Sequence, residues 1–302
     1  MSDSLVRAGA RALPAGLNAV GPLGFGCWRL TTGETAQAQG LVETALDLGM
    51  NLVDTADVYG LDYGGSGFGG NEEVLGNVLA AAPRLRDRMV LATKGGIMPP
   101  IPYDSSDNYL RSAVDESLQR LGVDVIDLYQ IHRPDLFAHP MQVADTLGSL
   151  VSEEKIRAVG ISNHTPAQHD ALVAHLDVPL ATSQPEFSPA FLGPLRDGTF
   201  DLCMRDGIVP LAWSPLGGGR LMSGDGVRPE LIATLDTLAE REGVDRAAIC
   251  CAFVLAHPSA PVALLGTQNP DRLRSAANAL NVRLDRSDVY RIVQDSEGVP
   301  LP

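Results

Sequence analysis

Short apolar runs alternate with longer amphipathic segments along the chain. The short runs are rich in β-branched residues and have the length of buried strands, whereas the longer segments place apolar residues at helical spacing. We expect eight strands, at Leu23–Cys27, Leu52–Asp54, Val90–Thr93, Ile126–Ile131, Ala158–Ile161, Ala181–Ser183, Val209–Trp213 and Val262–Leu265. We expect helices at Ala36–Leu48, Asn71–Ala81, Asp107–Leu121, Met141–Glu153, Pro166–His175, Pro229–Glu242 and Pro270–Leu280. This alternation predicts an α/β fold, a (β/α)8 TIM barrel in a single domain over residues 1–302, with a doubly wound sheet as the rival architecture.

Two connections, Gln184–Asp206 and Ser214–Arg228, are too long for plain βα turns. Long ordered loops in compact domains are usually functional, and a barrel carries its βα loops on the face where ligands bind. We therefore expect both segments beside a binding site.

Composition narrows the class of protein. The 302 residues carry a formal net charge of −14, which argues against a nucleic-acid surface because such surfaces need clustered Lys and Arg. The longest apolar run, Ala247–Ala256, is too short to cross a bilayer and indicates a buried helix. The N-terminal residues scatter acids and arginines where a signal peptide needs an apolar core. The four cysteines lack metal or disulfide spacing, so we expect a cytoplasmic protein with reduced thiols.

Reactive side chains follow three of the predicted strands. Asp54 ends the second strand and Tyr59 lies five residues further on, while Lys94 directly follows the third strand and His132 directly follows the fourth. A lysine ammonium lowers the pKa of a nearby phenol, and an acid keeps that lysine charged. We expect Lys94 and Asp54 to act on Tyr59 in this way, with His132 binding a substrate oxygen. Such a set suits hydride transfer to a carbonyl carbon with proton transfer to its oxygen.

Each of these residues also has a plain structural interpretation. An acid at a strand end is commonly a cap or turn residue, a tyrosine commonly packs in the core, and a barrel histidine commonly bonds to the backbone. The functional interpretation is preferred because core packing does not require an ionisable residue after three separate strands.

These residues lie in several longer motifs, namely Gly24-Phe25-Gly26-Cys27-Trp28, Asp54-Thr55-Ala56 with Tyr59-Gly60, Gly70-Asn71-Glu72 with Leu75-Gly76, Thr93-Lys94, Asp127-Leu128-Tyr129 with His132, and Gly160-Ile161-Ser162-Asn163. The motifs resemble those of the aldo-keto reductases. The segment WSPLGGGR at residues 213–220, with the preceding SPAFLGPLRDG at residues 188–198, resembles a bacterial subgroup of predicted oxidoreductases. The resemblance implies a (β/α)8 barrel that binds a nicotinamide dinucleotide across its C-terminal mouth. It also implies that Tyr59 is the acid/base, assisted by Asp54, Lys94 and His132.

The resemblance further implies the residues that bind the cofactor. They are Trp28, Asp54, Ser162, Asn163, Gln184, Trp213, Ser214, Pro215, Leu216, Gly217 and Arg220, with Gly266, Thr267, Gln268 and Arg272 around the adenosine phosphate. The family commonly has tyrosine at the Trp213 position, and NADP-binding members often have lysine at the Gly266 position and Glu-Asn at Ser275-Ala276.

We expect NADPH as the cofactor, with NADH as the alternative. Arg272 follows Asn269-Pro270-Asp271 at the start of a predicted helix, where free backbone N–H groups and the helix dipole favour an anion. The alternative interpretation is a surface arginine paired with Asp271 or with solvent.

The expected partner is a small-molecule carbonyl compound. The loop Gly95–Tyr103 and the residues Trp28, Leu30, Arg133, Phe137 and His164 follow strand ends. Their largely apolar character favours a neutral aldehyde or ketone over a phosphorylated sugar, although Arg133 could meet an acid group. Two other functions stay open: a non-catalytic, cofactor-sensing partner subunit on the same barrel, and a lyase.

Two further patterns favour plain interpretations. His164 and His169 lie five residues apart, which does not match the i,i+4 spacing of a helical zinc pair, so we expect no metal. Gly65-Ser66-Gly67-Phe68-Gly69-Gly70 has the letters of a dinucleotide fingerprint but follows a polar loop rather than a strand. It indicates a flexible substrate loop.

Overall fold

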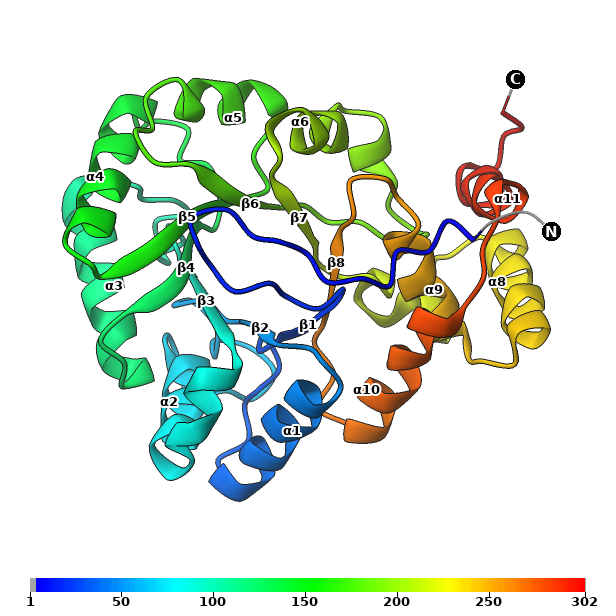
Figure 1. The fold of residues 1–302 in the computed structure, drawn as a ribbon, viewed down its shortest axis with the longest axis horizontal. Coiled ribbons are helices and arrows are strands. Elements are labelled where there is room, and N and C mark those ends of the chain that lie inside the picture. The colour runs from blue at the N-terminus through cyan, green and yellow to red at the C-terminus, as the bar shows by residue number, and fades with distance from the viewer. Residues whose placement is uncertain (1–3, 302) are drawn as a thin grey trace.

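The computed structural model describes residues 4–301 and forms a closed barrel of eight parallel strands (Figure 1). The strands follow one another around the barrel in chain order, and β8 pairs with β1 to close it. They are β1 Leu23–Gly26, β2 Leu52–Asp54, β3 Val90–Gly95, β4 Ile126–Ile131, β5 Ile156–Ser162, β6 Leu180–Gln184, β7 Val209–Ala212 and β8 Val262–Leu265. The predicted (β/α)8 barrel is confirmed, and the doubly wound alternative is wrong.

Helices surround the barrel in the order of the strands (Figure 1). The seven predicted helices are α1 Thr35–Asp47, α2 Gly70–Ala81, α3 Asp107–Leu121, α4 Pro140–Ser152, α5 Pro166–Val173, α8 Pro229–Glu242 and α10 Pro270–Ala277. Local sequence fixes their ends. Ser106 caps α3 by accepting a bond from Tyr109 N–H, and Gly122 ends it in the left-handed conformation.

The structure adds elements that the hydrophobic pattern did not predict. The two long connections contain α6 Thr199–Asp206 and the single turn α7 Arg220–Ser223, and α11 Arg286–Glu297 lies near the C-terminus. The apolar run expected to be a buried helix is α9 Arg246–Leu255, which packs against β8. Helix α8 packs against α9 and α11 on the outside of the barrel (Figure 1).

Two hydrophobic layers result from the alternation of side chains along the strands. One layer lies between the strands and the helices, and the other fills the barrel with residues such as Leu52, Leu128 and Leu211. The N-terminal segment crosses one end of the barrel, where Leu13 and Val20 join the inner layer (Figure 1). This segment closes the barrel at the N-terminal ends of the strands, so the C-terminal ends of the strands form the open mouth. Within residues 4–301, no helix combines the length and hydropathy that a membrane crossing requires.

Candidate active site

A buried ion pair lies at the mouth of the barrel. Asp54 ends β2 and Lys94 lies near the end of β3, and Lys94 Nζ donates to Asp54 Oδ2 at 2.6 Å. Lys94 is completely buried and also donates to the carbonyl oxygen of Thr55 at 2.8 Å. Burial lowers the pKa of Lys94, but Asp54 and Tyr59 together raise it by a larger amount, so the net shift is upward. The lysine is therefore held as an ammonium, as the sequence predicted.

Two glutamines complete the surroundings of Asp54. Gln130 on β4 and Gln184 on β6 donate to Asp54 Oδ1 at 3.1 and 3.0 Å, and Thr182 donates to Gln130 Oε1 at 3.2 Å. A side chain at Gly160 would collide with Thr182 Oγ1 and Gln130, so this glycine leaves room for the network. Sequence analysis missed Gln130, although a glutamine within the apolar run Ile126–Ile131 was a signal.

Tyr59 lies over the ion pair. Lys94 Nζ is 5.1 Å from the centroid of the Tyr59 ring, and the ring centroids of Tyr59 and His132 are 5.6 Å apart. Burial raises the pKa of Tyr59, and Lys94 lowers it by a smaller amount. The expectation that Lys94 lowers this pKa holds for its own contribution but is wrong for the net shift, because burial outweighs it.

His132 directly follows β4, and its ring lies beside the Tyr59 ring. Burial, then Lys94 and Arg133, hold its pKa well below its usual range, so the imidazole is neutral at neutral pH. Its Nδ1 has no hydrogen-bond partner among the described residues. A neutral imidazole carries one N–H donor, which suits it to bind an uncharged carbonyl oxygen.

A polar network joins the ends of β5, β6 and β7. Trp213 Nε1 donates to Asn163 Oδ1 at 3.1 Å, and Asn163 Nδ2 donates to Ser162 Oγ at 2.7 Å. Ser162 Oγ in turn donates to the carbonyl oxygen of Gln184 at 2.9 Å. This series of hydrogen bonds fixes the Trp213 indole at the mouth, where the residue is partly exposed.

The β7–α7 connection is a glycine-rich turn at the mouth. Ser214, Gly217, Gly218 and Gly219 all have positive φ, so the backbone curls sharply after Trp213. Arg220 Nε donates back to the carbonyl oxygen of Gly217 at 3.1 Å, and its side chain faces solvent. Pro215, Leu216 and Gly217, which the resemblance assigns to cofactor binding, lie in this turn.

Arg272 lies on the rim of the mouth at the start of α10. It is exposed and makes no ion pair within residues 4–301, whereas Asp271 pairs with Arg274 at 2.8 Å. Of the alternative interpretation, the pairing of Arg272 with Asp271 is therefore wrong, whereas a surface arginine in contact with solvent agrees with its exposure. The expectation of free N–H groups is also corrected, because Asn269 Oδ1 accepts from Asp271 N–H at 2.8 Å and Arg272 N–H at 3.4 Å. Gly266, Thr267 and Gln268 form the partly exposed turn before this helix.

The expected apolar pocket walls are only partly present. Trp28 is 36% exposed and lies 6.4 Å from Tyr59 between ring centroids, and Ile101 and Tyr103 are exposed on the β3–α3 loop. Leu30, however, is 1% exposed and packs in the outer core, and Phe137 projects fully into solvent. Neither residue lines a wall in this structure, because Leu30 is enclosed by the core and Phe137 is surrounded by solvent.

The histidines singled out in the sequence are separate. His164 Nδ1 bonds to the carbonyl oxygen of Ser162 at 3.0 Å, whereas His169 lies in α5 beside Asp170 and Asp206. Arg205 bridges these two acids at 2.9 and 2.6 Å, so a guanidinium already offsets part of the negative charge of that cluster.

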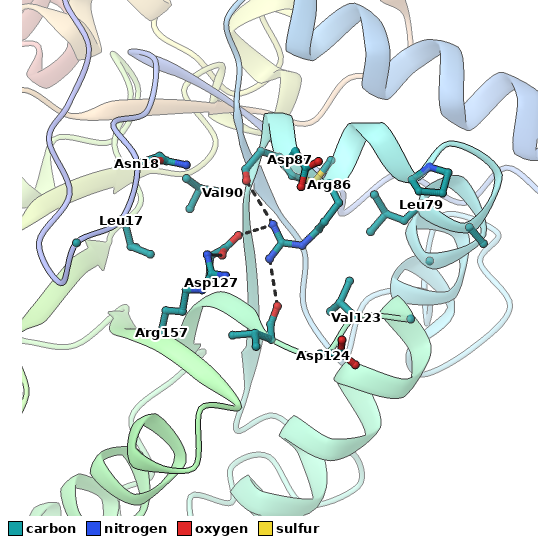
Figure 2. A pocket seen from close by; sticks show the side chains of 17 residues that line it. Leu17, Asn18, Leu79, Arg86, Asp87, Val90, Val123, Asp124, Asp127 and Arg157 are labelled. Carbon is teal, nitrogen blue, oxygen red and sulfur yellow. Dashed lines mark hydrogen bonds and ion pairs between the residues drawn. The ribbon is translucent and has the colours of Figure 1, made fainter.

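A cavity of about 720 Å³ lies at the opposite, N-terminal end of the barrel (Figure 2). Arg86 is directed at Asp127 there, with Nη1 2.7 Å from Asp127 Oδ2, and Arg157 lies 2.9 Å from Asp127 Oδ1. This cavity is remote from Tyr59 and Lys94, which lie at the mouth, near the C-terminal ends of the strands.

Comparisons with known proteins place this geometry in a family. The model of the Aldo/keto reductase family matches residues 22–296. A 6-dehydroglucose reductase of Novosphingobium aromaticivorans is 49% identical over the full length of both chains. A 6-dehydroglucose reductase of Agrobacterium fabrum is 34% identical, over 89% of this chain and 91% of that one. Oxidoreductase YdhF of Escherichia coli is 35% identical, over 92% and 94%.

Solved structures agree with the fold. A glycerol dehydrogenase from Gluconobacter oxydans matches with a TM-score of 0.83 and 26% identity, over 97% of both chains. An aldo/keto reductase from Klebsiella pneumoniae, solved in complex with NADP and acetate, matches with a TM-score of 0.79 and 25% identity, over 97% of this chain and 96% of that one. The resemblance to bacterial oxidoreductases is confirmed: the chain belongs to the aldo/keto reductase family and is an oxidoreductase enzyme.

Proposed function

We propose that this enzyme uses NADPH, with NADH as the alternative, to reduce the aldehyde of an uncharged sugar derivative of the 6-dehydroglucose type. The observation that carries the proposal is the buried Asp54–Lys94 pair beside Tyr59 and His132 at the barrel mouth. The substrate class rests on the relatives named 6-dehydroglucose reductase, one of which is 49% identical to this chain.

Tyr59 supplies the proton in this proposal. Its raised pKa keeps the phenol protonated at neutral pH, so it has a proton to give to the carbonyl oxygen. The Lys94 ammonium, 5.1 Å from the ring centroid, then stabilises the phenolate that remains. Reduction adds a hydride to the carbonyl carbon and this proton to its oxygen, which gives an alcohol.

Asp54 and His132 support this transfer. Asp54 keeps Lys94 charged, and the bonds from Gln130 and Gln184 fix the carboxylate that does so. Neutral His132 offers an N–H donor to the same carbonyl oxygen, which orients the carbonyl and stabilises developing negative charge.

The chain offers a surface for a nicotinamide coenzyme, which supplies the hydride when bound. The Trp213 indole is fixed by its bond to Asn163, whose amide also donates to the carbonyl oxygen of His132, and it presents an apolar face at the mouth. Ser162, Asn163 and Gln184 provide polar groups next to that face, and the turn from Ser214 to Arg220 provides backbone groups and a cation. We assign the rim formed by Gly266, Thr267, Gln268 and Arg272 to the adenosine phosphate.

Steady-state coenzyme oxidation tests the proposal. The purified protein is assayed with NADPH and NADH against 6-dehydroglucose, glyceraldehyde, benzaldehyde, a simple ketone and glyceraldehyde 3-phosphate. We expect the highest kcat/KM for 6-dehydroglucose and a low value for the phosphorylated aldehyde. Tight coenzyme binding without turnover of any carbonyl would support the cofactor-sensing alternative instead, and preference for the phosphorylated aldehyde would contradict the proposed substrate class.

A further inference from the structure

A second buried acid, Asp57, lies in the segment between Asp54 and Tyr59. The residue has no exposed surface. Its backbone N–H donates to the carbonyl oxygen of Lys94 at 3.0 Å, and its own carbonyl oxygen accepts from Gly69 N–H at 2.6 Å. The segment that carries Tyr59 is thus attached through Asp57 to the strand end that carries Lys94.

The Asp57 side chain makes a second connection between the same two segments. Tyr109 on α3 donates its hydroxyl to Asp57 Oδ2 at 2.8 Å, and the backbone N–H of Gly96 faces the same phenol oxygen. Gly96 lies two residues after Lys94. One phenol therefore touches both the segment before Tyr59 and the turn after Lys94.

A second tyrosine crowds the same place. Tyr129 on β4 is completely buried, and its hydroxyl has no hydrogen-bond partner within residues 4–301. A side chain at Gly95 would collide with Tyr129 Oη and lie 3.2 Å from Asp57 Oδ2. A carboxyl group and a phenol thus pack behind Gly95, immediately beyond Lys94.

The charges around Asp57 nearly balance, so burial dominates. Glu72 on α2 and Arg120 on α3 face it, and these two bond to each other at 2.7 Å. Tyr109 and Tyr129 are the other titratable groups that surround it. Burial raises the pKa of Asp57 to about 7, while the Tyr109 bond opposes that rise. Its Oδ1 lacks a partner in the described part of the chain, which is costly for a purely structural carboxylate.

We infer that Asp57 is a positioning residue, which acts through Tyr109 to fix Tyr59 relative to Lys94. The inference rests on the proposed function, since it takes Tyr59 as the proton donor. Ionised Asp57 is the stronger acceptor for the Tyr109 hydroxyl. Turnover therefore rises with pH as Asp57 ionises near neutrality, because the bond that joins the two segments strengthens.

Three variants of the full-length enzyme test this inference, with NADPH and glyceraldehyde as probes from about pH 5.5 to about pH 8.5. Asp57→Asn keeps the shape of the side chain but cannot ionise. We expect it to lower kcat roughly tenfold at the upper end of this range, to change KM less than about twofold, and to flatten the rise near neutrality. Tyr109→Phe removes the bond through which Asp57 acts, so we expect it to lower kcat and to flatten the rise near neutrality as Asp57→Asn does.

Asp127→Asn is the matched control, because Asp127 is also buried and hydrogen-bonded but lies at the far end of the barrel. We expect the wild-type kcat and pH profile for it. An Asp57→Asn enzyme that retains the inflection overturns the inference, and so does a loss of kcat that is equal at every pH, because that pattern is structural.

Amide hydrogen exchange gives a readout that does not need turnover. At matched pH 8, we expect peptides covering residues 55–60 and 94–97 to exchange faster in Asp57→Asn than in wild type. Unchanged exchange in both segments overturns the inference. An absence of carbonyl reduction in the wild-type enzyme contradicts the proposed function instead, and the exchange result still decides whether Asp57 holds these segments together.

Discussion

The two ends of the barrel contain the same arrangement with different chemistry. At the mouth, Asp54 accepts hydrogen bonds from Lys94, Gln130 and Gln184. At the closed end, Asp127 accepts from Leu91 N–H at 2.8 Å and pairs with Arg86 and Arg157. Each carboxylate joins neighbouring strands, and each has several donors.

The two ends differ in the cations that face the carboxylate. Arginine stays charged in proteins, and Arg157 is 59% exposed in its side chain, so Asp127 has partners that do not exchange protons. Lys94 is completely buried next to a phenol, where a change in charge on one group alters the pKa of the other. In the proposed function, similar bonding therefore serves stability at the closed end and proton transfer at the mouth.

Tyr59→Phe should give the largest effect at the mouth. The ring and its contacts remain, but the transferable proton is lost, so we expect turnover to fall about 10²- to 10⁴-fold while NADPH affinity is retained. Steady-state kinetics and coenzyme titration by fluorescence check this. Turnover near the wild-type value with an unchanged pH profile would exclude Tyr59 as the donor.

Lys94→Met should be as damaging as Tyr59→Phe, because the two residues act as one unit. We expect the double variant to be scarcely worse than either single variant. A double-mutant cycle on kcat checks this, with urea unfolding as a control because the change leaves Asp54 buried without its cation. Losses that multiply in the double variant would mean that the mouth lacks the coupling that distinguishes it from the closed end.

Arg272→Ala tests whether the rim of the mouth recognises the adenosine phosphate. A 2′-phosphate carries nearly two negative charges, and Arg272 is exposed without an acidic partner within residues 4–301. We expect NADPH binding to weaken by about 1.5–3 kcal/mol and NADH binding to change little. Isothermal titration with both coenzymes checks this. Equal weakening, or tighter NADH binding by the wild-type protein, would show that this loop does not recognise the phosphate.

Replacing the buried acids Asp127 and Asp57 should change the free energy of unfolding in different ways. Asp127→Asn removes a charge from two arginine pairs, so we expect a loss of about 2 kcal/mol of unfolding free energy without loss of turnover.

Asp57→Asn should instead remove a pH dependence of the unfolding free energy that Asp57 causes. The pKa of Asp57 is about 7 in the folded protein and ~3.9 in an unfolded chain, so the folded state retains a proton between these values. The stabilisation of the folded state by protonated Asp57 is fully present below about pH 4 and is lost as pH rises through 7. We expect Asp57→Asn to gain roughly 4 kcal/mol relative to wild type between pH 4 and pH 8. Urea unfolding at both pH values checks this, and a pH-independent difference would contradict it.

The sequence alone determined most of the barrel. Its apolar runs located all eight strands, because a strand in a closed parallel sheet is buried on both faces and leaves a nearly continuous apolar signal. Helices α3 and α8 match their predicted bounds because Ser106, Pro229, Gly122 and Gly243 mark their ends. The short α6 and the exposed α11 were missed because neither segment contains a clear apolar repeat that comes directly after a predicted strand.

The sequence also indicated the strand-end groups of the site, because the ends of parallel strands meet at one face. Only the tertiary structure decided their environment. Gln130 and Gln184 come from strands far apart in the chain, yet both bond to Asp54. The net pKa of Tyr59 and the burial of Asp57 likewise depend on how much water the neighbouring elements exclude. Residue order locates a charged group, but desolvation and partners brought from distant segments set its protonation.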